Sequence, residues 1–216
     1  MTASAQPTPE SASGRSWLDP IKSVARTGRR IAAATYRQVR DSIDQRLHDR
    51  RRSRSLTRLR TRPPQSVLMI CLGNICRSPF AEFALQRALP GHGVKIQSAG
   101  FIGPDRSSPE RAQAAALEFG IDLGPHRSKL ITTKMLREHD LIVVMETGQR
   151  TKLMVDHRVP DDQILLLGDL DPQPIDTRTI LDPYAGSPDD FRRCYERVQR
   201  CIDTLASVLA DAAPRA

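Results

Sequence analysis

From residue 66 onward, short continuous apolar runs alternate with longer segments of helical periodicity. The short runs are typical of strands buried on both faces, and they lie at 67–70, 94–99, 141–145 and 164–167. The segments with helical spacing lie at 79–89, 108–118, 132–138, 147–155 and 188–210. Strands that alternate with helices predict an α/β fold, here a doubly wound, four-stranded parallel sheet with helices on both faces.

The first 62 residues follow a different pattern. Residues 1–16 are mostly Ser, Thr, Pro and Ala, a composition typical of disorder. Between residues 17 and 47, apolar residues recur at roughly helical spacing with arginines between them, which predicts one or two amphipathic helices interrupted near Gly28. A basic run at 50–62 ends at Pro63-Pro64. We therefore expect two parts: a basic, partly disordered N-terminal extension at 1–62, and a globular domain at 63–216.

The positive charge of the chain lies almost entirely in the extension. Residues 1–62 contain 15 Lys and Arg against 5 Asp and Glu, whereas residues 63–216 contain 18 against 20. A basic amphipathic helix followed by an arginine run suits an anionic membrane surface or a partner protein. Arg-rich, Ser-rich composition also resembles an organellar transit peptide, and a solvated tail is the simplest alternative. The aromatic and base-reading motifs of a nucleic-acid module are missing, so we predict no specific nucleic acid.

Other features of the composition bear on the compartment. No apolar run approaches the roughly 18 residues of a membrane span. No n-region followed by an apolar h-region stands at the start, so we expect no secretory signal. The four cysteines are too few and too unevenly spaced for a disulfide-stapled secreted domain. We expect a cytoplasmic protein, and we expect any membrane association of residues 17–62 to be peripheral.

The loop that follows the first strand contains the strongest candidate chemistry. Cys71 stands at the carboxyl end of the strand, and Arg77 follows six residues later at the start of a helix. Gly73 between them allows backbone N–H groups to converge on an anion, and the helix terminus adds partial positive charge. The same field favours the thiolate form of Cys71. One loop thus supplies a nucleophile and a clamp for an oxyanion.

The full motif is more specific than this spacing. It reads Cys-Leu-Gly-Asn-Ile-Cys-Arg-Ser-Pro at 71–79, and Ser-Ala-Gly at 98–100, His-Arg-Ser at 126–128, Leu-Leu-Gly-Asp at 166–169 and Asp-Pro-Tyr at 182–184 follow it in order. Over residues 66–210 the chain resembles the low-molecular-weight protein tyrosine phosphatase family. The resemblance implies hydrolysis of phosphotyrosine through a phosphocysteine intermediate, without a metal or cofactor. Its implied substrate is a phosphotyrosine-containing protein, such as a tyrosine kinase.

The resemblance also implies roles for individual residues. Cys71 would attack phosphorus, Arg77 would hold two phosphate oxygens, and Asp182 would protonate the leaving group and then activate water. Tyr184 would flank the aromatic ring of the substrate. Loop residues would bind phosphate or support the loop: Leu72, Gly73, Asn74, Ile75, Cys76 and Ser78.

Some of these positions have a more specific expected role. The Ser78 hydroxyl can donate to the Cys71 thiolate. The family implies Asn74 as a brace of the loop, with His126 as its partner. Cys76 either forms a protective disulfide with Cys71 under oxidation, as the family often does, or is simply a packed thiol.

Two related activities use the same loop and remain as alternatives. Thiol-dependent arsenate reductases need two further cysteines in the middle of the chain, and residues 130–170 contain none. Protein-arginine phosphatases tend to carry Thr where this chain has Ile75, and an apolar Ile favours the phosphotyrosine activity.

The chain departs from the family pattern at other positions. Glu146 and Arg150 stand where the family often has Asp and Asn, and we expect consequences only at the surface. The stretch at 100–109 lacks the usual Trp or Tyr of the substrate-selecting loop, with only Phe101 nearby.

Overall fold

The structure is a computed structural model that describes residues 19–212, with the side chains of residues 35, 36 and 38–212. Four strands form one parallel sheet: β1 (Ser66–Cys71), β2 (Lys95–Gly100), β3 (Leu141–Val144) and β4 (Ile164–Leu166). Their order in the sheet is β2-β1-β3-β4, with Cys71 paired to Gly100 and Ile70 paired to Val144. The predicted four-stranded parallel sheet is confirmed.

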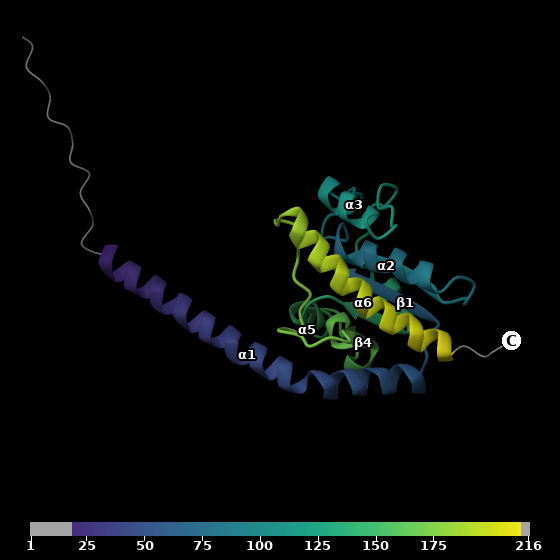
Figure 1. Cartoon of the computed structure of the whole chain (residues 1–216), viewed down its shortest axis with the longest axis horizontal. Coiled ribbons are helices and arrows are strands. Elements are labelled where there is room, and N and C mark those ends of the chain that lie inside the picture. The colour runs from purple at the N-terminus through teal and green to yellow at the C-terminus, as the bar shows by residue number, and fades with distance from the viewer. Residues whose placement is uncertain (1–18, 213–216) are drawn as a thin grey trace, which may run out of the picture. The chain divides into compact units, whose positions relative to one another are not determined.

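Helices cover both faces of this sheet, as the sequence predicts. One face carries α2 (Arg77–Ala88), α3 (Glu110–Leu117) and α6 (Pro188–Ala212), of which α2 and α6 lie side by side (Figure 1). The other face carries α4 (Thr133–Glu138) and α5 (Thr147–Asp156). Two short 3-10 helices, η1 (Asp161–Gln163) and η2 (Leu167–Leu170), flank β4. The Thr132 hydroxyl caps α4 by accepting a hydrogen bond from Met135 N at 3.1 Å.

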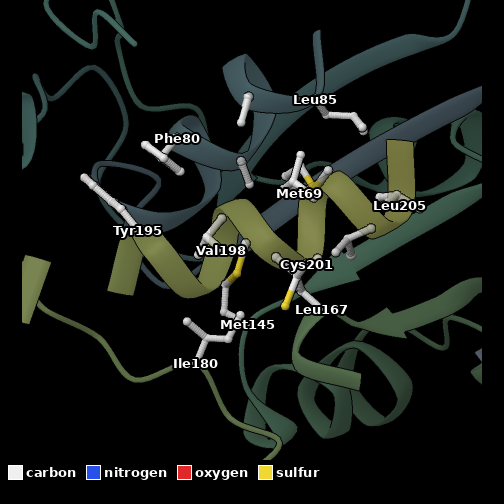
Figure 2. Packing of buried hydrophobic residues seen from close by; sticks show 14 of the residues in the cluster. Met69, Phe80, Leu85, Met145, Leu167, Ile180, Tyr195, Val198, Cys201 and Leu205 are labelled. Carbon is white, nitrogen blue, oxygen red and sulfur yellow. The ribbon is translucent and has the colours of Figure 1, made fainter. Parts of the chain in front are cut away.

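Alternate residues of each strand belong to two hydrophobic cores. Val67, Met69 and Cys71 of β1 join the larger cluster under α2 and α6, whereas Leu68 and Ile70 join the smaller cluster under α4 and α5. Figure 2 shows α6 across the larger core, with its buried side chains beside those of β1 and η2. Because both faces of β1 are buried, its last residue is held firmly by two layers of packing.

The N-terminal extension differs from its prediction. Residues 1–16 and Trp17 lie outside the described residues. Helix α1 (Asp19–Thr61) is continuous, so the predicted interruption near Gly28 is wrong. A glycine inside a helix costs only about 0.5–1 kcal/mol relative to alanine, which the many helix-forming neighbours offset.

The chain divides into two compact units, residues 1–40 and residues 41–216. The second unit therefore starts 22 residues before Pro63, where the sequence analysis placed the boundary. The reason is that the last turns of α1 pack on the domain: Leu56 and Leu59 are 8 % and 2 % exposed and belong to the larger core. Burial of a leucine contributes about 1.5–3 kcal/mol, so this packing is substantial. Across residues 19–212, no helix combines the length and apolar content that crossing a membrane requires.

Candidate active site

The candidate site is a cavity of about 170 Å³ at the carboxyl end of β1. Strand β1 pairs with β2 on one side and β3 on the other, so the chain leaves it at the switch in strand order. Ligands in parallel α/β sheets bind at such a position. The cavity is lined by Cys71, Leu72, Gly73, Ile75, Cys76, Ile102, Arg106, Asp182 and Tyr184. The predicted loop and the predicted Asp-Pro-Tyr segment, about a hundred residues apart in sequence, thus meet at one cavity.

Two hydrogen bonds converge on the sulfur of Cys71. Ser78 Oγ donates to Cys71 Sγ at 3.0 Å, and the backbone N–H of Asn74 donates at 3.2 Å. Both donors favour negative charge on the sulfur. Helix α2 starts at Arg77 without a side-chain cap and without an acidic residue in its first turn. Its first N–H groups and its dipole are therefore available to an anion at the mouth of the loop.

Asn74 holds the loop in shape from inside the protein. It is fully buried and adopts the left-handed backbone conformation, with φ of 50°. Its side-chain amide donates to Ser78 Oγ at 2.9 Å and Ser98 Oγ at 2.8 Å, and its Oδ1 accepts from Lys129 N at 2.8 Å. Asparagine tolerates this backbone conformation better than most residues do. Asn74 therefore lies where the sequence analysis expects a brace of the loop.

His126 contacts the same loop from the segment before β3. Its Nε2 lies 2.7 Å from the carbonyl oxygen of Asn74, and because a carbonyl can only accept, Nε2 carries the proton. Burial lowers the pKa of His126, which outweighs the opposing effect of the bond to Asn74. The imidazole is therefore neutral at pH 7. It supports the loop and does not line the cavity.

Arg77 is fully buried, with carboxylates on two sides. Its Nη1 donates to Glu146 Oε1 at 2.6 Å and to Ile180 O at 2.8 Å, and its Nη2 donates to Asp182 Oδ2. Burial alone would lower the pKa of Arg77, but the charges of Cys71, Asp182 and Glu146 outweigh it, so the pKa is raised. Its Nε has no hydrogen-bond partner among the described residues. A buried donor without a partner is costly, and a phosphate oxygen would satisfy it.

Asp182 and Tyr184 come from the long irregular segment before α6. The Asp182 side chain is 35 % exposed, and its Oδ1 accepts a hydrogen bond from Tyr184 N at 3.2 Å. Tyr184 is 60 % exposed and stands at the mouth of the cavity. The segment therefore brings a carboxylate and an aromatic ring to the open side of the cavity, opposite the loop that carries Cys71.

From the sequence, the departure at Glu146 is expected to matter only at the surface, and the structure corrects this. Glu146 lies two residues after the end of β3, and its carboxylate binds both Arg77 and Gln149 Nε2, the latter at 3.0 Å. Its place just beyond the carboxyl end of a buried strand is the sequence signal that could have identified it. Arg150, in contrast, pairs with Asp161 on the surface, as expected.

The Glu146–Arg77 pair leads to a prediction about phosphate binding. Glu146→Gln is expected to raise the inhibition constant for inorganic phosphate or to lower kcat/KM by about tenfold, because a buried guanidinium loses a charged partner. Glu146→Asp keeps the charge and is the matched control, which should retain most of the activity. Steady-state kinetics with an aryl phosphate would measure both. If the Gln and Asp variants are both as active as wild type, the Glu146–Arg77 pair is dispensable.

Arg106 and Ile102 line the cavity and were missed by sequence reasoning. Arg106 Nη2 donates to Gly73 O at 2.9 Å and to Ile102 O at 3.1 Å, and its Nε donates to Gly103 O at 2.9 Å. The arginine therefore ties the loop after β2 to the Cys71 loop. Phe101 packs against the smaller core instead of lining the cavity. No motif marks Arg106, so only its position after the strand could have suggested it.

Gly100 ends β2 directly behind the Cys71 loop. A Cβ at this position would lie 2.7 Å from Asn74 N and 2.9 Å from Leu72 O, both backbone atoms that cannot move aside. Leu72 O also accepts hydrogen bonds from the backbone N–H groups of Phe101 and Ile102, at 2.8 and 3.2 Å. The loop can approach the strand this closely only because Gly100 lacks a side chain.

This close contact predicts that an added methyl group is much more harmful at position 100 than at a glycine with open space around it. Gly100→Ala is expected to lower the free energy of unfolding by about 1–3 kcal/mol and to reduce activity, because the loop must shift. Gly148→Ala, in α5, is the control, since a Cβ there meets no atom within 4 Å. It should be neutral or stabilise the protein by up to about 1 kcal/mol. Urea unfolding measures both, and an unperturbed Gly100→Ala enzyme would contradict the tight contact.

The remaining cysteines are buried. Cys76 lines the cavity, while Cys194 and Cys201 lie in α6, and all are free thiols. Burial raises the pKa of Cys76 and Cys201, and it raises that of Cys194 to about 12. These three thiols are therefore protonated at pH 7. Both cysteines of α6 pack in the larger core.

Comparison with known protein families gives one match that spans most of the chain. Residues 66–214 match the family described as low molecular weight phosphotyrosine protein phosphatase. Among curated proteins, the low molecular weight protein-tyrosine-phosphatase Etp of Escherichia coli K12 is 35 % identical over 147 residues, which is 67 % of this chain and 95 % of Etp. The match begins at the first strand of the sheet and leaves α1 outside.

Solved structures agree with this comparison. The crystal structure of the Erwinia amylovora tyrosine phosphatase AmsI is 33 % identical with a TM-score of 0.59, covering 70 % of this chain and 95 % of AmsI. The arginine phosphatase YwlE of Geobacillus stearothermophilus is 26 % identical with a TM-score of 0.60, covering 68 % of this chain and 93 % of YwlE. The backbone fold is thus about equally close to these two structures, and sequence identity is higher to AmsI than to YwlE.

Proposed function

This chain belongs to the low molecular weight phosphotyrosine protein phosphatase family and hydrolyses phosphotyrosine in proteins, and we propose that Cys71, Arg77 and Asp182 carry out the reaction. The observation that carries the proposal is that Cys71 and Asp182 line one small cavity while the fully buried Arg77 donates to Asp182. The two donors on Cys71 Sγ support its role as the nucleophile.

The first chemical step transfers the phosphoryl group to the enzyme. The Cys71 thiolate attacks phosphorus, the bond from phosphorus to the tyrosine oxygen breaks, and Asp182 gives its proton to the leaving phenolate. Arg77 and the N–H groups of the loop hold the three equatorial oxygens, where charge spreads in the transition state. The products of this step are tyrosine and a phosphocysteine.

The second step releases phosphate. The Asp182 carboxylate takes a proton from a water molecule, which attacks phosphorus as the bond to Cys71 Sγ breaks. The thiolate that leaves accepts hydrogen bonds from Ser78 Oγ and Asn74 N, which makes it a better leaving group. The enzyme returns to its starting state without a cofactor.

Substrate binding requires an exchange of partners on Arg77. In the structure, Arg77 Nη2 donates to Asp182. A phosphate dianion would take this donor and the unpartnered Nε in the bidentate geometry that guanidinium groups prefer. Asp182, no longer paired with the guanidinium, would take up a proton from solvent and face the leaving oxygen as the acid. Glu146 and Ile180 O keep their bonds to Nη1, so the guanidinium stays in place during the exchange.

Ile75 supports phosphotyrosine over phosphoarginine as the substrate. Its side chain lines the cavity, and it offers no hydroxyl to a water that would attack a phosphoramidate. The aromatic ring of Tyr184 at the rim can pack on the ring of a tyrosine. The missing mid-chain cysteines argue against arsenate reduction.

Side-by-side assays would test this choice of substrate. Matched peptides that carry phosphotyrosine or phosphoarginine are incubated with the wild-type chain, with a metal chelator present. We expect release of phosphate from phosphotyrosine at a rate at least about tenfold higher, since recognition of the wrong leaving group loses transition-state contacts. Faster hydrolysis of phosphoarginine would overturn the substrate assignment and leave the phosphocysteine chemistry intact.

The physiological substrate that we propose is a phosphorylated cytoplasmic protein, such as a tyrosine kinase. The N-terminal extension would bring the enzyme to an anionic membrane surface. Tyr36, Val39 and Ile43 are 70 %, 55 % and 47 % exposed and follow helical spacing along α1, with arginines between them. Apolar side chains among basic ones suit the interface of an anionic bilayer.

Vesicle sedimentation would test the membrane proposal. The full chain should bind vesicles that contain anionic lipid, and Val39→Glu should weaken this binding, whereas Asp49→Asn on the same helix should not. Equal binding of all three proteins, or binding equally strong to neutral vesicles, would remove the membrane role of residues 17–62.

A further inference from the structure

The segment that carries Asp182 has little regular structure of its own. Residues 171–187, here called the acid loop, connect η2 to α6 without a helix or strand. Its second half is held from the catalytic domain: Ile180 N donates to Met145 O at 2.9 Å, and Ile180 O accepts from Arg77. Its first half is tied to α6, where Arg197 donates to Thr177 O and Thr179 O at 2.6 and 3.1 Å, and it makes further contacts elsewhere.

Helix α1 supplies three of those contacts. His48 Nε2 lies 2.9 Å from Asp171 O, and Asp44 Oδ2 accepts a hydrogen bond from Arg178 N at 3.2 Å. Gln45 Nε2 donates to Asp176 Oδ1 at 3.2 Å. Residues 44 and 48 are one turn apart and therefore lie on the same face of the helix. Two of these three bonds end on backbone atoms of the acid loop, so they fix the path of the chain itself.

The two residues on this face are buried although they are polar. Asp44 and His48 are only 6 % and 5 % exposed. Arg51 Nη1 also donates to Asp44 Oδ1 at 2.7 Å, which leaves Oδ2 of the carboxylate for the backbone of Arg178. Because buried polar groups are costly unless they are hydrogen-bonded, this face of α1 matches the acid loop and not water, although His48 Nδ1 has no partner among the described residues.

The helix is also anchored independently of the acid loop. Leu56 and Leu59 pack in the larger core, and Arg58 donates two hydrogen bonds of 3.2 Å to Ile164 O in β4. The face with Asp44 and His48 is therefore presented from a helix whose end is fixed to the sheet. The family match starts at Ser66, so these contacts come from outside the part shared with the family.

We propose that Asp44 and His48 are positioning residues, through which α1 holds the acid loop so that Asp182 meets the leaving oxygen. This inference rests on the proposed role of Asp182 as the general acid. The positioning acts through the chain: Arg178 is four residues before Asp182, and a span of that length extends at most about 14 Å. Release of Arg178 N and Asp171 O widens the range of positions that the acid can sample, and misplacement by about 1 Å can cost up to about 100-fold in rate.

The test compares two leaving groups in the full-length chain. Phenyl phosphate needs a proton on its leaving oxygen, whereas 2,4-dinitrophenyl phosphate releases a stable anion and needs none. For the double variant Asp44→Ala, His48→Ala we expect kcat/KM for phenyl phosphate to fall by about tenfold relative to that for the dinitrophenyl ester. His48→Gln keeps a side-chain N–H donor and should recover part of the loss.

Two variants of the same helix serve as controls. Arg60→Met and Asp49→Ala each change an exposed side chain of α1. Both should keep the ratio of the two kcat/KM values at the wild-type level. If the double variant does not fold, the single variants His48→Ala and His48→Gln make the same comparison.

Asp182→Asn, measured in parallel, separates the two ideas. One outcome is that its kcat/KM falls selectively for phenyl phosphate while that of the α1 variants falls equally for both substrates or for neither. In that case α1 does not position the acid and the inference is wrong. If Asp182→Asn shows no selectivity, Asp182 is not the acid, and the proposed mechanism falls together with the inference. A selective loss in both the Asp182 and the α1 variants supports the positioning role.

Discussion

Cys71→Ser is expected to abolish the hydrolysis of aryl phosphates, with kcat lowered by more than about 10⁴-fold. A serine hydroxyl is far less ionised than a thiol at neutral pH, and the two donors on Cys71 Sγ cannot make it an alkoxide. The phosphate site itself remains, because Arg77 and the loop backbone are unchanged. The variant should therefore still bind phosphate or a phosphotyrosine peptide, which calorimetry can measure.

The control for this variant is a second buried thiol. Cys194→Ser changes the same atom in α6, where the thiol is buried in the larger core and donates to Leu181 O at 3.6 Å. It should keep kcat within about threefold of wild type, since substitutions away from the reacting atoms change stability more than chemistry. Measurable steady-state turnover by Cys71→Ser, after a check for contaminating wild-type enzyme, would contradict a phosphocysteine mechanism.

Asp182→Asn is expected to lower kcat/KM by about 10²–10⁴-fold for esters of poor leaving groups, the range that general acid catalysis contributes. Tyrosine, with a side-chain pKa of about 10, is such a leaving group. For a dinitrophenyl ester the loss in kcat/KM should be small, because the leaving anion needs no proton. A series of aryl phosphates gives the dependence of kcat/KM on leaving-group pKa, which should be steeper in the variant.

A second readout separates loss of the acid from disruption of the site. Asparagine keeps the size of the side chain, so phosphate binding should survive in Asp182→Asn and become slightly tighter, since the competing carboxylate on Arg77 is gone. Asp176→Asn changes another carboxylate of the same loop and should leave the leaving-group dependence unaltered. A uniform loss across all leaving groups in Asp182→Asn would argue for a structural role of this residue.

Much of this arrangement was predictable because local patterns specify it. The four apolar runs are each too short for a helix and are separated by helical segments, so a parallel sheet with helices on both faces follows. The thiol and the arginine belong to one loop, where spacing alone brings them together. The position of Asp182, in contrast, came only from the resemblance to the family, because nothing in the local sequence links residue 182 to residue 71.

The features that were missed depend on contacts that the sequence pattern does not record. Glu146 follows a strand as many solvent-exposed residues do, and only the approach of Arg77 gives it a role. The last turns of α1 contain many arginines and look like a solvated extension, yet Leu56 and Leu59 face the core. An arginine-rich composition hides this face, since long basic side chains can cover apolar surface while their charges stay in water.

The pairing of Asp182 with Arg77 has a consequence for the charge of the ester that binds. The Asp182 carboxylate and an incoming phosphate compete for the same guanidinium donor. A dianion displaces the carboxylate more readily than an anion with a single negative charge does, because its attraction to the buried guanidinium is stronger. The pair therefore favours the doubly charged form of the ester, and the displaced carboxylate takes up a proton before it acts as the acid.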